Sequence, residues 1–548
     1  MSKLTINNDR IEVQFPYDPK RIALIRTVFG RKWHRDSRCW SVPISEAGEL
    51  EKLGFGHIKV SEKPASVVPR LMNFGKIPMP FQQAGFSFIE THSGRALIGD
   101  EMGLGKTIQA LMYLHNHPEL RPALIICPNP LKLNWKREID ECLGLPADAT
   151  YIIDGQDHVL PSAEIYIINY DKLANKREKH IDLETGKKKR KAVAGTGWVD
   201  FLPKFGFKLL IIDEVQALAN WSADRTKDTI KYLHRHKGAL IALSGTPITS
   251  RPIQFYPILN VLLPQGTLPP WKTYGITYCN GKHNGFGWDF KGASNLEKLR
   301  ALVSRVMIRR LKKDVLPELP EKVRTAIPLP INCKQYAAAE RDWLKWLKEV
   351  DPEKLTRAER AAGLVRTQLL QEMARKARWP ETLDWIKSLL EAREKLIVFG
   401  KTYAAVDSVF AATKKYNPVK IDGRQDLENR KQQEAHFQTD ENCRLIVGTM
   451  QAMGAGLTLT AGNGVVFVEM PWNPGTLDQA EDRPHRIGQR GTVNVYYLLA
   501  QGSIEMGVAN LLDSKRKTLA ALLDGDFSVS EDSMLLELMR KFKKNVTA

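Results

Sequence analysis

The chain has 548 residues and a formal net charge of +19, from 81 Lys and Arg against 62 Asp and Glu. Its 43% hydrophobic and 26% charged residues exclude a mostly disordered or fibrous chain, and no apolar run reaches the roughly 18–20 residues needed to cross a bilayer. The length predicts about three or four folding units, and the positive charge favours a polyanionic partner, most often nucleic acid. Six scattered cysteines without a CxxC pair indicate a reducing compartment, and the first residues lack a signal-peptide core.

Residues 1–62 are expected to form a small unit of their own. Alternating apolar residues predict a half-buried strand over 11–15, and helical spacing predicts a helix over 19–29. Two short strands around a polar turn are predicted within 30–43. The polar, proline-containing residues 61–70 are the expected linker to the rest of the chain.

From about residue 71, short apolar runs alternate with longer helical segments. The strand-like runs are residues 95–99, 122–128, 165–169, 208–214 and 239–245, and then 395–400, 444–449 and 464–470. This rhythm predicts α/β lobes built on parallel sheets with helices on both faces. We expect one lobe over 71–265, a linking segment with helical insertions over 266–390, a second lobe over 391–525 and a helical tail over 526–548.

Two charged segments carry open alternatives. The basic run Lys187–Lys191 (KKKRK) is interpreted as a solvated loop. The alternatives are a nuclear localisation signal and a DNA contact. The C-terminal residues 530–545 are acidic and then basic, which complements a helix dipole. Packing on the second lobe is their expected role, and a partner-binding tail is the alternative.

A phosphate-binding loop is predicted where the strand ALIG runs into DEMGLGKT and then into a helix. Gly103 and Gly105 let the backbone curl so that its N–H groups point at phosphate oxygens. Lys106 is expected to reach the β- and γ-phosphates, and the Thr107 hydroxyl to coordinate Mg²⁺. Asp100 departs from the GxxxxGK[ST] pattern, which has glycine at that position.

Two further motifs strengthen the nucleotide prediction. The strand LLIIDEVQ ends in two carboxylates, of which Asp213 is expected to hold Mg²⁺ and Glu214 to act as general base on the attacking water. An acidic pair that merely closes a strand is the alternative. In QAEDRPHRIGQ, Arg483 and Arg486 are three residues apart and would share one face of a helix. They are candidate arginine fingers supplied by the second lobe, although in isolation they would be surface residues.

Together these motifs resemble the Swi/Snf family of superfamily-two helicase-like ATPases, over nearly all of residues 75–515. The segment GTMQAMGAGLTLTAGNGVVFVEMPWNPGTLDQAEDRPHRIGQ (448–489) carries the most specific likeness. In PFQQAG, Gln82 resembles the adenine-reading glutamine of the family. The segments CPNPLKLNW, LSGTPITSRP and VMIRRLKKDVLPELPEK are similar to its DNA-contact, lobe-coupling and second-lobe entry motifs.

Within that family the chain is most similar to the HARP branch of annealing helicases. YCNGKHNGFGWDFKGASNLEKL (278–299) resembles that branch, and the N-terminal residues resemble a single short HARP domain. Gln216 replaces the usual histidine of the DExH motif, and a glutamine can still donate and accept hydrogen bonds there. Chromatin-reading modules are absent from the sequence, which favours a minimal, viral or bacterial, DNA translocase.

The resemblance implies a fold of two RecA-like parallel-sheet lobes with helical insertions, plus a small α+β N-terminal HARP-like domain. It implies an ATP- and Mg²⁺-dependent motor on double-stranded and forked DNA that acts as a monomer without membrane contact, in the cytoplasm or the nucleus. Replication or repair proteins are the implied partners. Gln479 joins Glu214, Arg483 and Arg486 as an implied catalytic residue. The implied DNA contacts are Lys132, Asn134, Thr449, Gly454 and Thr458.

The preferred hypothesis is an ATP-driven translocase that remodels or re-anneals branched DNA. The alternatives are a motor that displaces proteins from duplex DNA, and a DNA-binding scaffold that uses nucleotide as a switch. In the N-terminal unit, Arg31, Lys32 and Arg38 are predicted DNA contacts, with Trp33 and Trp40 available to stack on bases. The alternative is that both tryptophans form the core of this small unit.

Overall fold

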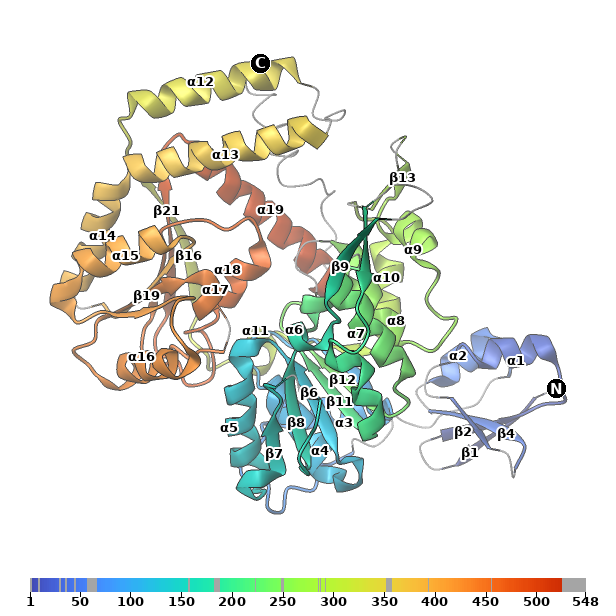
Figure 1. Ribbon diagram of the computed structural model, residues 1–548. Coiled ribbons are helices and arrows are strands. Elements are labelled where there is room, and N and C mark those ends of the chain that lie inside the picture. The colour runs from blue at the N-terminus through green and yellow to red at the C-terminus, as the bar shows by residue number, and fades with distance from the viewer. Residues whose placement is uncertain are drawn as a thin grey trace. The chain divides into compact units, whose positions relative to one another are not determined.

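The computed structural model of the chain is shown in Figure 1. It describes residues 2–7, 10–28, 31–34, 37–43, 46–56, 67–155, 158–181, 188–221, 223–247, 251–283, 285, 287–290, 292–350, 357–392, 394–454 and 456–524. The expected linker residues 61–66 and the tail 526–548 lie outside this range. Apart from the short segments 249–251 and 291–293, the chain divides between Leu311 and Lys312 into two compact units.

The N-terminal part of the first unit is a four-stranded antiparallel sheet with helices on one face (Figure 1). Its elements are β1 (Lys3–Asn7), β2 (Arg10–Gln14), α1 (Pro19–Ile25), β3 (Lys32–His34), β4 (Cys39–Pro43) and α2 (Ala47–Lys52), in the sheet order β1-β2-β4-β3. Asp18 begins α1 by accepting the Lys20 backbone N–H at 2.8 Å. The buried core of this part is Ile11, Val13, Ile25, Val28, Val42, Leu50 and Phe55.

The main sheet of the first unit has seven parallel strands. Their order is β15 (Met307–Ile308), β5 (Arg95–Ile98), β12 (Ala239–Leu243), β11 (Leu209–Asp213), β6 (Ala123–Cys127), β8 (Ile165–Asn169) and β7 (Thr150–Ile152). The central strands are buried along their whole length, which explains why they consist of unbroken apolar runs rather than alternating ones. Helices α3 (Pro80–Thr91), α4 (Lys106–Asn116) and α5 (Lys132–Leu143) share one buried cluster with this sheet.

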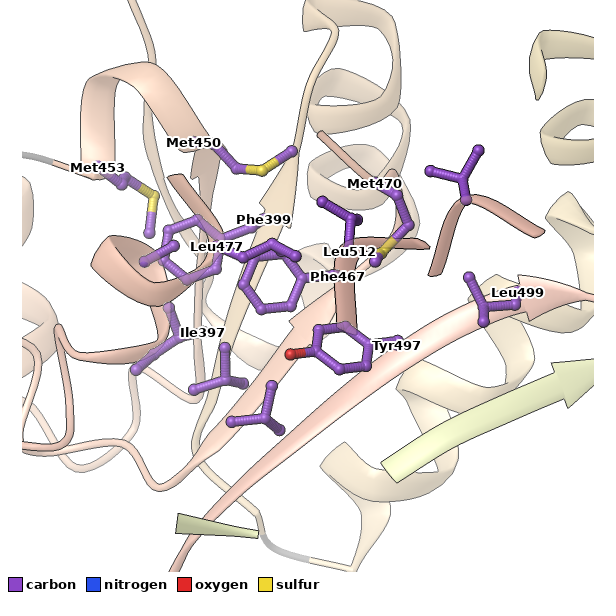
Figure 2. Close-up of a cluster of buried hydrophobic side chains, with 14 of the residues drawn as sticks. Ile397, Phe399, Met450, Met453, Phe467, Met470, Leu477, Tyr497, Leu499 and Leu512 are labelled. Atoms are coloured by element: carbon purple, nitrogen blue, oxygen red, sulfur yellow. The ribbon is translucent and has the colours of Figure 1, made fainter. Parts of the chain in front are cut away.

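The second unit is built on six parallel strands. Their order is β16 (Lys322–Leu329), β21 (Val493–Ala500), β20 (Gly464–Phe467), β17 (Leu396–Gly400), β19 (Leu445–Thr449) and β18 (Val419–Ile421). Figure 2 shows its core, where Phe399 and Phe467 on neighbouring strands stack with ring centroids 5.2 Å apart and Tyr497 lies against Phe467. The predicted α/β class with two parallel-sheet lobes is confirmed.

Eight described helices, four to 21 residues long, belong to the second unit with this sheet. They are α12 (Lys334–Glu349), α13 (Arg357–Ala377), α14 (Trp379–Glu391), α15 (Tyr403–Ala412), α16 (Leu427–Thr439), α17 (Met450–Met453), α18 (Pro474–Glu481) and α19 (Ile504–Asp524). At the junction of α13 and α14, fully buried Arg378 pairs with Glu505 at 2.7 and 3.0 Å. Residues 266–390, which were expected to link the lobes, span the division between the units: apart from 291–293, those up to 311 lie in the first unit and the rest in the second.

The remaining elements lie outside the main sheets of the two units. They are α6 (Tyr170–Leu173), β9 (Arg177–Ile181), β10 (Lys188–Ala192), α7 (Asp224–Arg235), α8 (Tyr256–Leu262), α9 (Trp271–Tyr278), β13 (Lys282–His283), β14 (Trp288–Asp289), α10 (Leu296–Val303) and α11 (Lys312–Val315). The basic run at 187–191 was expected to be a loop, but from Lys188 onward it is strand β10, paired antiparallel with β9. Cross-strand pairing overrides the loop tendency of a charged run.

All six cysteines are free. Five are buried and only Cys333, which caps α12 by accepting the Tyr336 N–H, is half-buried. Burial raises the pKa of the Cys142 thiol to about 12. Among the described helices, none combines the length and the apolar character that crossing a membrane requires.

Candidate active site

Strand β5 ends in a loop that wraps the start of α4. Gly103 and Gly105 both adopt positive φ, at 86° and 72°. A Cβ on Gly105 would lie 2.3 Å from the Gln82 Nε2 atom, so the loop has space only for glycine there. The Lys106 ammonium donates to the backbone carbonyls of Asp100, at 2.9 Å, and Glu101, at 3.3 Å. The predicted phosphate-binding loop thus has its glycine bends and its lysine at the N-terminus of an 11-residue helix.

Lys106 is surrounded by carboxylates. Burial lowers the pKa of its ammonium, while the negative charges of Glu214, Asp100 and Asp213 act in the opposite direction. Thr107, the next residue, is half-buried in the first turn of α4. A cation held in this way is well placed to exchange its carbonyl partners for phosphate oxygens.

Asp100, which departs from the usual glycine, is a fully buried anchor. Its carboxylate accepts from the Arg310 guanidinium at 2.9 Å to Oδ1 and 2.5 Å to Oδ2, and from the Gln109 amide at 2.9 Å. Arg310 also donates to the Phe81 carbonyl and lies over the Phe81 ring. A bidentate pair of this kind fixes the base of the loop, so the aspartate is structural and leaves phosphate binding to its neighbours.

Gln82, the predicted adenine reader, lies against the phosphate-binding loop and is only 2% exposed. Its Nε2 donates to the Leu104 carbonyl at 3.1 Å, and its Oε1 accepts the Met79 N–H at 2.9 Å at the start of α3. Both ends of the amide are therefore bonded to the protein. Gln82 supports the loop in this structure, and contact with adenine stays a prediction.

Asp213 ends β11 next to the phosphate-binding loop. Its carboxylate accepts the Trp135 indole N–H at 2.8 Å and the Glu214 backbone N–H at 2.9 Å, and its carbonyl accepts the Tyr170 hydroxyl at 2.6 Å. Burial, together with the neighbouring Glu214 charge, raises the pKa of Asp213 to about 7. The positive charge around this carboxylate is therefore too small to keep its pKa at the ordinary value.

The donor set fits a magnesium ion. Asp213 offers a carboxylate short of positive charge, and Thr107 offers a hydroxyl; oxygen ligands of both kinds suit Mg²⁺. No cluster of three or more His, Cys, Asp or Glu side chains that could hold a metal occurs among the described residues. Mg²⁺ is commonly held by one or two carboxylates plus substrate phosphates, so a full protein cage is not required.

A hydrogen-bonded chain leads from the predicted base to the LSGT motif. Glu214 has φ 51°, which turns the backbone sharply after β11. The Gln216 amide donates to the Glu214 carboxylate at 2.5 Å, and its oxygen accepts the Ser244 hydroxyl at 2.6 Å. Ser244 in turn accepts the Thr246 N–H at 3.1 Å. Gln216 can therefore donate and accept at once, as expected for the residue that replaces histidine.

The two candidate arginine fingers lie outside a helix, contrary to expectation. Helix α18 ends at Glu481, and Arg483 and Arg486 follow in turns. They still come together, because both guanidinium groups donate to the Leu457 carbonyl, at 3.4 and 3.2 Å. Pro484 follows Arg483 and cannot continue a helix, which explains the difference. The backbone oxygen of Gln479 accepts from Arg483 at 3.1 Å.

The predicted DNA contacts fall near the ends of sheet strands. Lys132 and Asn134 begin α5, soon after β6; Lys132 is 5% exposed and pairs with Asp154, and Asn134 is half-buried. In the second unit, Thr449 ends β19 and caps α17, and Gly454 follows α17. The Thr458 hydroxyl accepts from Arg486 at 3.0 Å, so the structure joins one DNA candidate to an arginine candidate. Their roles on DNA stay predictions.

The tryptophans of the N-terminal part do not form its core. Trp33 is 48% exposed, and Trp40 only flanks the aliphatic cluster. Their ring centroids lie 5.2 Å apart. Lys32 and Arg38 are exposed and Arg31 is half-buried. Since aliphatic side chains and Phe55 fill the core, the structure removes the alternative in which both tryptophans form it.

Sequence patterns missed several residues that build the site. They are Arg310, Trp135 and Tyr170, which hold Asp100 or Asp213 from distant parts of the chain, and Gln109, which holds Asp100 from the helix that follows the loop. The RR pair of VMIRRLKK was a usable signal, because two adjacent arginines after an apolar run demand buried partners. The others have no local signature.

Comparison with known families agrees with this geometry. The model for the SNF2-related domain matches residues 68–377, which is more than half of the chain, and the model for the helicase conserved C-terminal domain matches residues 381–488. The chain belongs to the SNF2 family. The SNF2-related domain and the helicase C-terminal domain together indicate a DNA-dependent ATPase of the helicase-like superfamily.

Similar SNF2-family proteins include annealing helicases. The chain is 32% identical to the DNA annealing helicase and endonuclease ZRANB3 of Bos taurus, over 82% of this chain and 40% of that protein. It is 31% identical to the SWI/SNF-related matrix-associated actin-dependent regulator of chromatin subfamily A-like protein 1 of Xenopus tropicalis, over 97% of this chain and 57% of that protein. The chain thus spans about half the length of these relatives. Among solved structures, the Sulfolobus solfataricus SWI2/SNF2 ATPase core in complex with dsDNA is 22% identical, over 88% of this chain and 98% of that one, with a TM-score of 0.38.

Proposed function

We propose that the chain is an ATP-dependent translocase on double-stranded DNA that remodels forks or re-anneals separated strands. The observation that carries the proposal is the chain of hydrogen bonds from Glu214 through Gln216 to Ser244. These bonds join Glu214, the proposed general base, to Ser244 of the LSGT motif in the same lobe. A shift of either residue would therefore disturb the other. A nucleotide-switched scaffold has no need for a base that is tied in this way.

The proposed chemistry uses the first unit to hold the nucleotide. Lys106 and the amides of its loop bind the phosphates, and Glu214 accepts the proton of the attacking water. Mg²⁺, when bound at Thr107 and Asp213, supplies charge neutralisation on the phosphates. Arg483 and Arg486 belong to the second unit, and their guanidinium groups would stabilise charge on the transferring phosphoryl group. Hydrolysis then depends on movement of that unit.

The proposed substrate is the phosphate backbone of DNA. The net charge of +19 favours a polyanion, and the candidates Lys132, Asn134 and Thr449 follow or end sheet strands, where α/β sheets present their binding loops. Contacts with phosphate position a protein without reading sequence. Re-annealing is proposed because relatives carry annealing helicase in their names, and because the N-terminal part exposes a ring and cations.

The central experiment measures ATP hydrolysis without DNA and with single-stranded, duplex and forked DNA of equal length. Stimulation by duplex, and more by forked DNA, is the expected result, and a fluorescent-strand assay should show re-annealing that needs ATP. Lys106→Ala is the inactive control. A protein that binds ATP and DNA but turns over at the same slow rate in all four conditions would support the scaffold instead.

The role of the N-terminal part is tested by the ratio of forked-DNA to duplex stimulation. Trp33→Ala removes an exposed ring, 48% accessible, without touching the core, and should lower this ratio. Stacking of one base is worth about 1–3 kcal/mol. Deletion of residues 1–62 should lower it further and leave hydrolysis on plain duplex. An unchanged ratio in both folded variants would remove this part from substrate choice.

A further inference from the structure

The boundary between the two units falls inside a short charged segment, residues 309–322, which we name the connector. Arg310 is bound within the first unit and Lys312 within the second. Leu311 is the single residue between them. The partners on each side belong to, or adjoin, the nucleotide motifs described above.

The first anchor is a continuation of the sheet that carries the phosphate-binding loop. Strand β15 pairs in parallel with β5, which leads into that loop. Beyond the strand, the Gly99 N–H donates to the Ile308 carbonyl at 2.8 Å, and the Glu101 N–H donates to the Arg310 carbonyl at 2.9 Å. The Glu101 amide of the loop is therefore bonded directly to the connector, and the Gly99 amide to the residue that precedes it.

Side chains secure the same anchor. The Arg310 guanidinium grips both carboxylate oxygens of buried Asp100, and the Asp100 carbonyl accepts the Lys106 ammonium. Arg309 donates to the Gly99 carbonyl at 2.8 Å. A displacement of the connector by one ångström would therefore move the groups that hold the phosphate-binding lysine.

The second anchor holds the turn that carries the two arginines. The Lys312 ammonium is 3% exposed and lies 3.0 Å from Asp482 Oδ1, and it donates to the His485 carbonyl at 2.5 Å. Lys322 contacts the same Asp482 oxygen at 2.8 Å. The His485 ring lies 2.9 Å from the Pro320 carbonyl. Asp482 and His485 directly precede Arg483 and Arg486, so the connector positions both.

We propose that the connector is a positioning element that passes movement of the second unit to the phosphate-binding loop through Leu311. Its anchored residues act through Lys106 and the arginines and do not touch substrate themselves. The inference rests on the proposed function, since it requires that DNA drives hydrolysis. Stability alone does not account for the arrangement, because each anchor would stabilise its own unit whatever the number of residues between Arg310 and Lys312.

Two glycines inserted after Leu311 test this directly, because they lengthen the link and keep every anchoring side chain. Loss of coupling should lower the ratio of DNA-stimulated to DNA-free hydrolysis by about 5- to 150-fold, with KM for ATP nearly unchanged. The control is the same insertion after Gly266, an exposed turn glycine with open space around it. An unchanged ratio in the Leu311 variant would overturn the proposal.

A second measurement needs neither DNA nor turnover. Arg310→Lys keeps the charge but loses the bidentate grip, so amide hydrogen exchange should become faster at Gly99 and Glu101. Arg378→Lys is the control, since Arg378 also grips a carboxylate in a bidentate manner but lies outside the connector. Equal amide exchange rates at Gly99 and Glu101 in the two variants would contradict the proposal that Arg310 anchors the connector to the loop.

The failures of the two proposals are distinguishable. A parent protein without DNA stimulation would overturn the translocase and the connector together. A stimulated parent whose Leu311 insertion variant keeps the same ratio would overturn the connector alone.

Discussion

Two pairs of adjacent acidic residues, Asp213 with Glu214 in the first unit and Glu481 with Asp482 in the second, differ in electrical environment. Burial and the Glu214 charge raise the pKa of Asp213 in the first unit to about 7. Burial alone would also raise the pKa of Glu481 in the second unit, but Lys322, Arg516 and Arg324 hold it at about 2. Lys312 and Lys322 likewise hold the pKa of Asp482 well below its usual range.

The difference distinguishes a carboxylate that can bind a cation from one that stabilises the backbone around it. A buried carboxylate with its own lysines and arginines is already neutralised, so it fixes the backbone and has little to gain from a ligand. A buried carboxylate beside another acid gains from any arriving cation. By this criterion Asp213 belongs to the chemistry, and Glu481 and Asp482 belong to the support of the arginine-bearing turn.

The largest effect is expected from Glu214→Gln. Loss of a general base typically costs ~10²–10⁴-fold in turnover, while ATP binding should persist because the phosphate-binding loop is untouched. The substitution also removes the neighbouring charge that raises the pKa of Asp213. Single-turnover hydrolysis and nucleotide titration measure the two effects. Turnover within a few-fold of the parent would disprove the assignment of the base.

Asp482→Asn should act on folding instead of chemistry. It leaves Lys312 and Lys322 buried without their shared carboxylate, and breaking a buried pair costs about 3–5 kcal/mol. Urea unfolding of the second unit should show this loss. Asp384→Asn, at an exposed ion pair with Lys387, is the control and should change stability by less than about 1 kcal/mol. Equal stability of the two variants would refute the distinction drawn above.

Gln216→Ala should weaken the coupling of DNA binding to ATP hydrolysis while it leaves the proposed catalytic residues in place. The Glu214 carboxylate and the Ser244 hydroxyl each lose a partner, and the DNA-stimulated rate should fall by about 5- to 150-fold. Gln216→His should restore part of the rate, since an imidazole can also donate and accept. Steady-state hydrolysis at saturating ATP, with and without duplex DNA, provides the comparison. Full activity of the alanine variant would show that the hydrogen-bonded chain is dispensable.

The raised pKa of Asp213 also predicts a pH dependence of stability. Because the folded pKa of Asp213 is raised from 3.8 to about 7, the folded state binds more protons than the unfolded state between these values. Without Mg²⁺, this group makes the protein less stable as pH rises from about 4 to 7, by up to about 1.4 kcal/mol per pH unit. Mg²⁺ should bind more tightly as pH rises through 7. Thermal unfolding with and without Mg²⁺ measures both trends, and Asp213→Asn should abolish them.

Local patterns predicted the parts of the site that are local. Lys106, Thr107 and Asp213 stand beside buried strands, and a strand followed by glycines and a helix leaves few alternatives for a loop. Family likeness drew attention to Gln216, which the structure shows bonded to Glu214 and Ser244; its role in coupling stays a prediction. The buried strand runs likewise predicted both parallel sheets.

Other features depend on contacts that no window of sequence contains. The partner of Asp100 is Arg310, which lies 210 positions later and is held by β15, a strand of two residues without any periodic pattern. The division between the two compact units falls between Leu311 and Lys312, inside the expected linking segment 266–390, and no local sequence pattern marks that point. The expected helix around Arg483 ended early because Pro484 follows.

The burial of the cysteines makes site-specific labelling of the chain possible. Five of the thiols are buried, and Cys333 alone is partly accessible, at the start of α12 in the second unit. A maleimide dye would therefore enter the native chain at that one point. Energy transfer between this dye and a fluorophore at a DNA end would report the position of the second unit in real time during each turnover, without the removal of any cysteine.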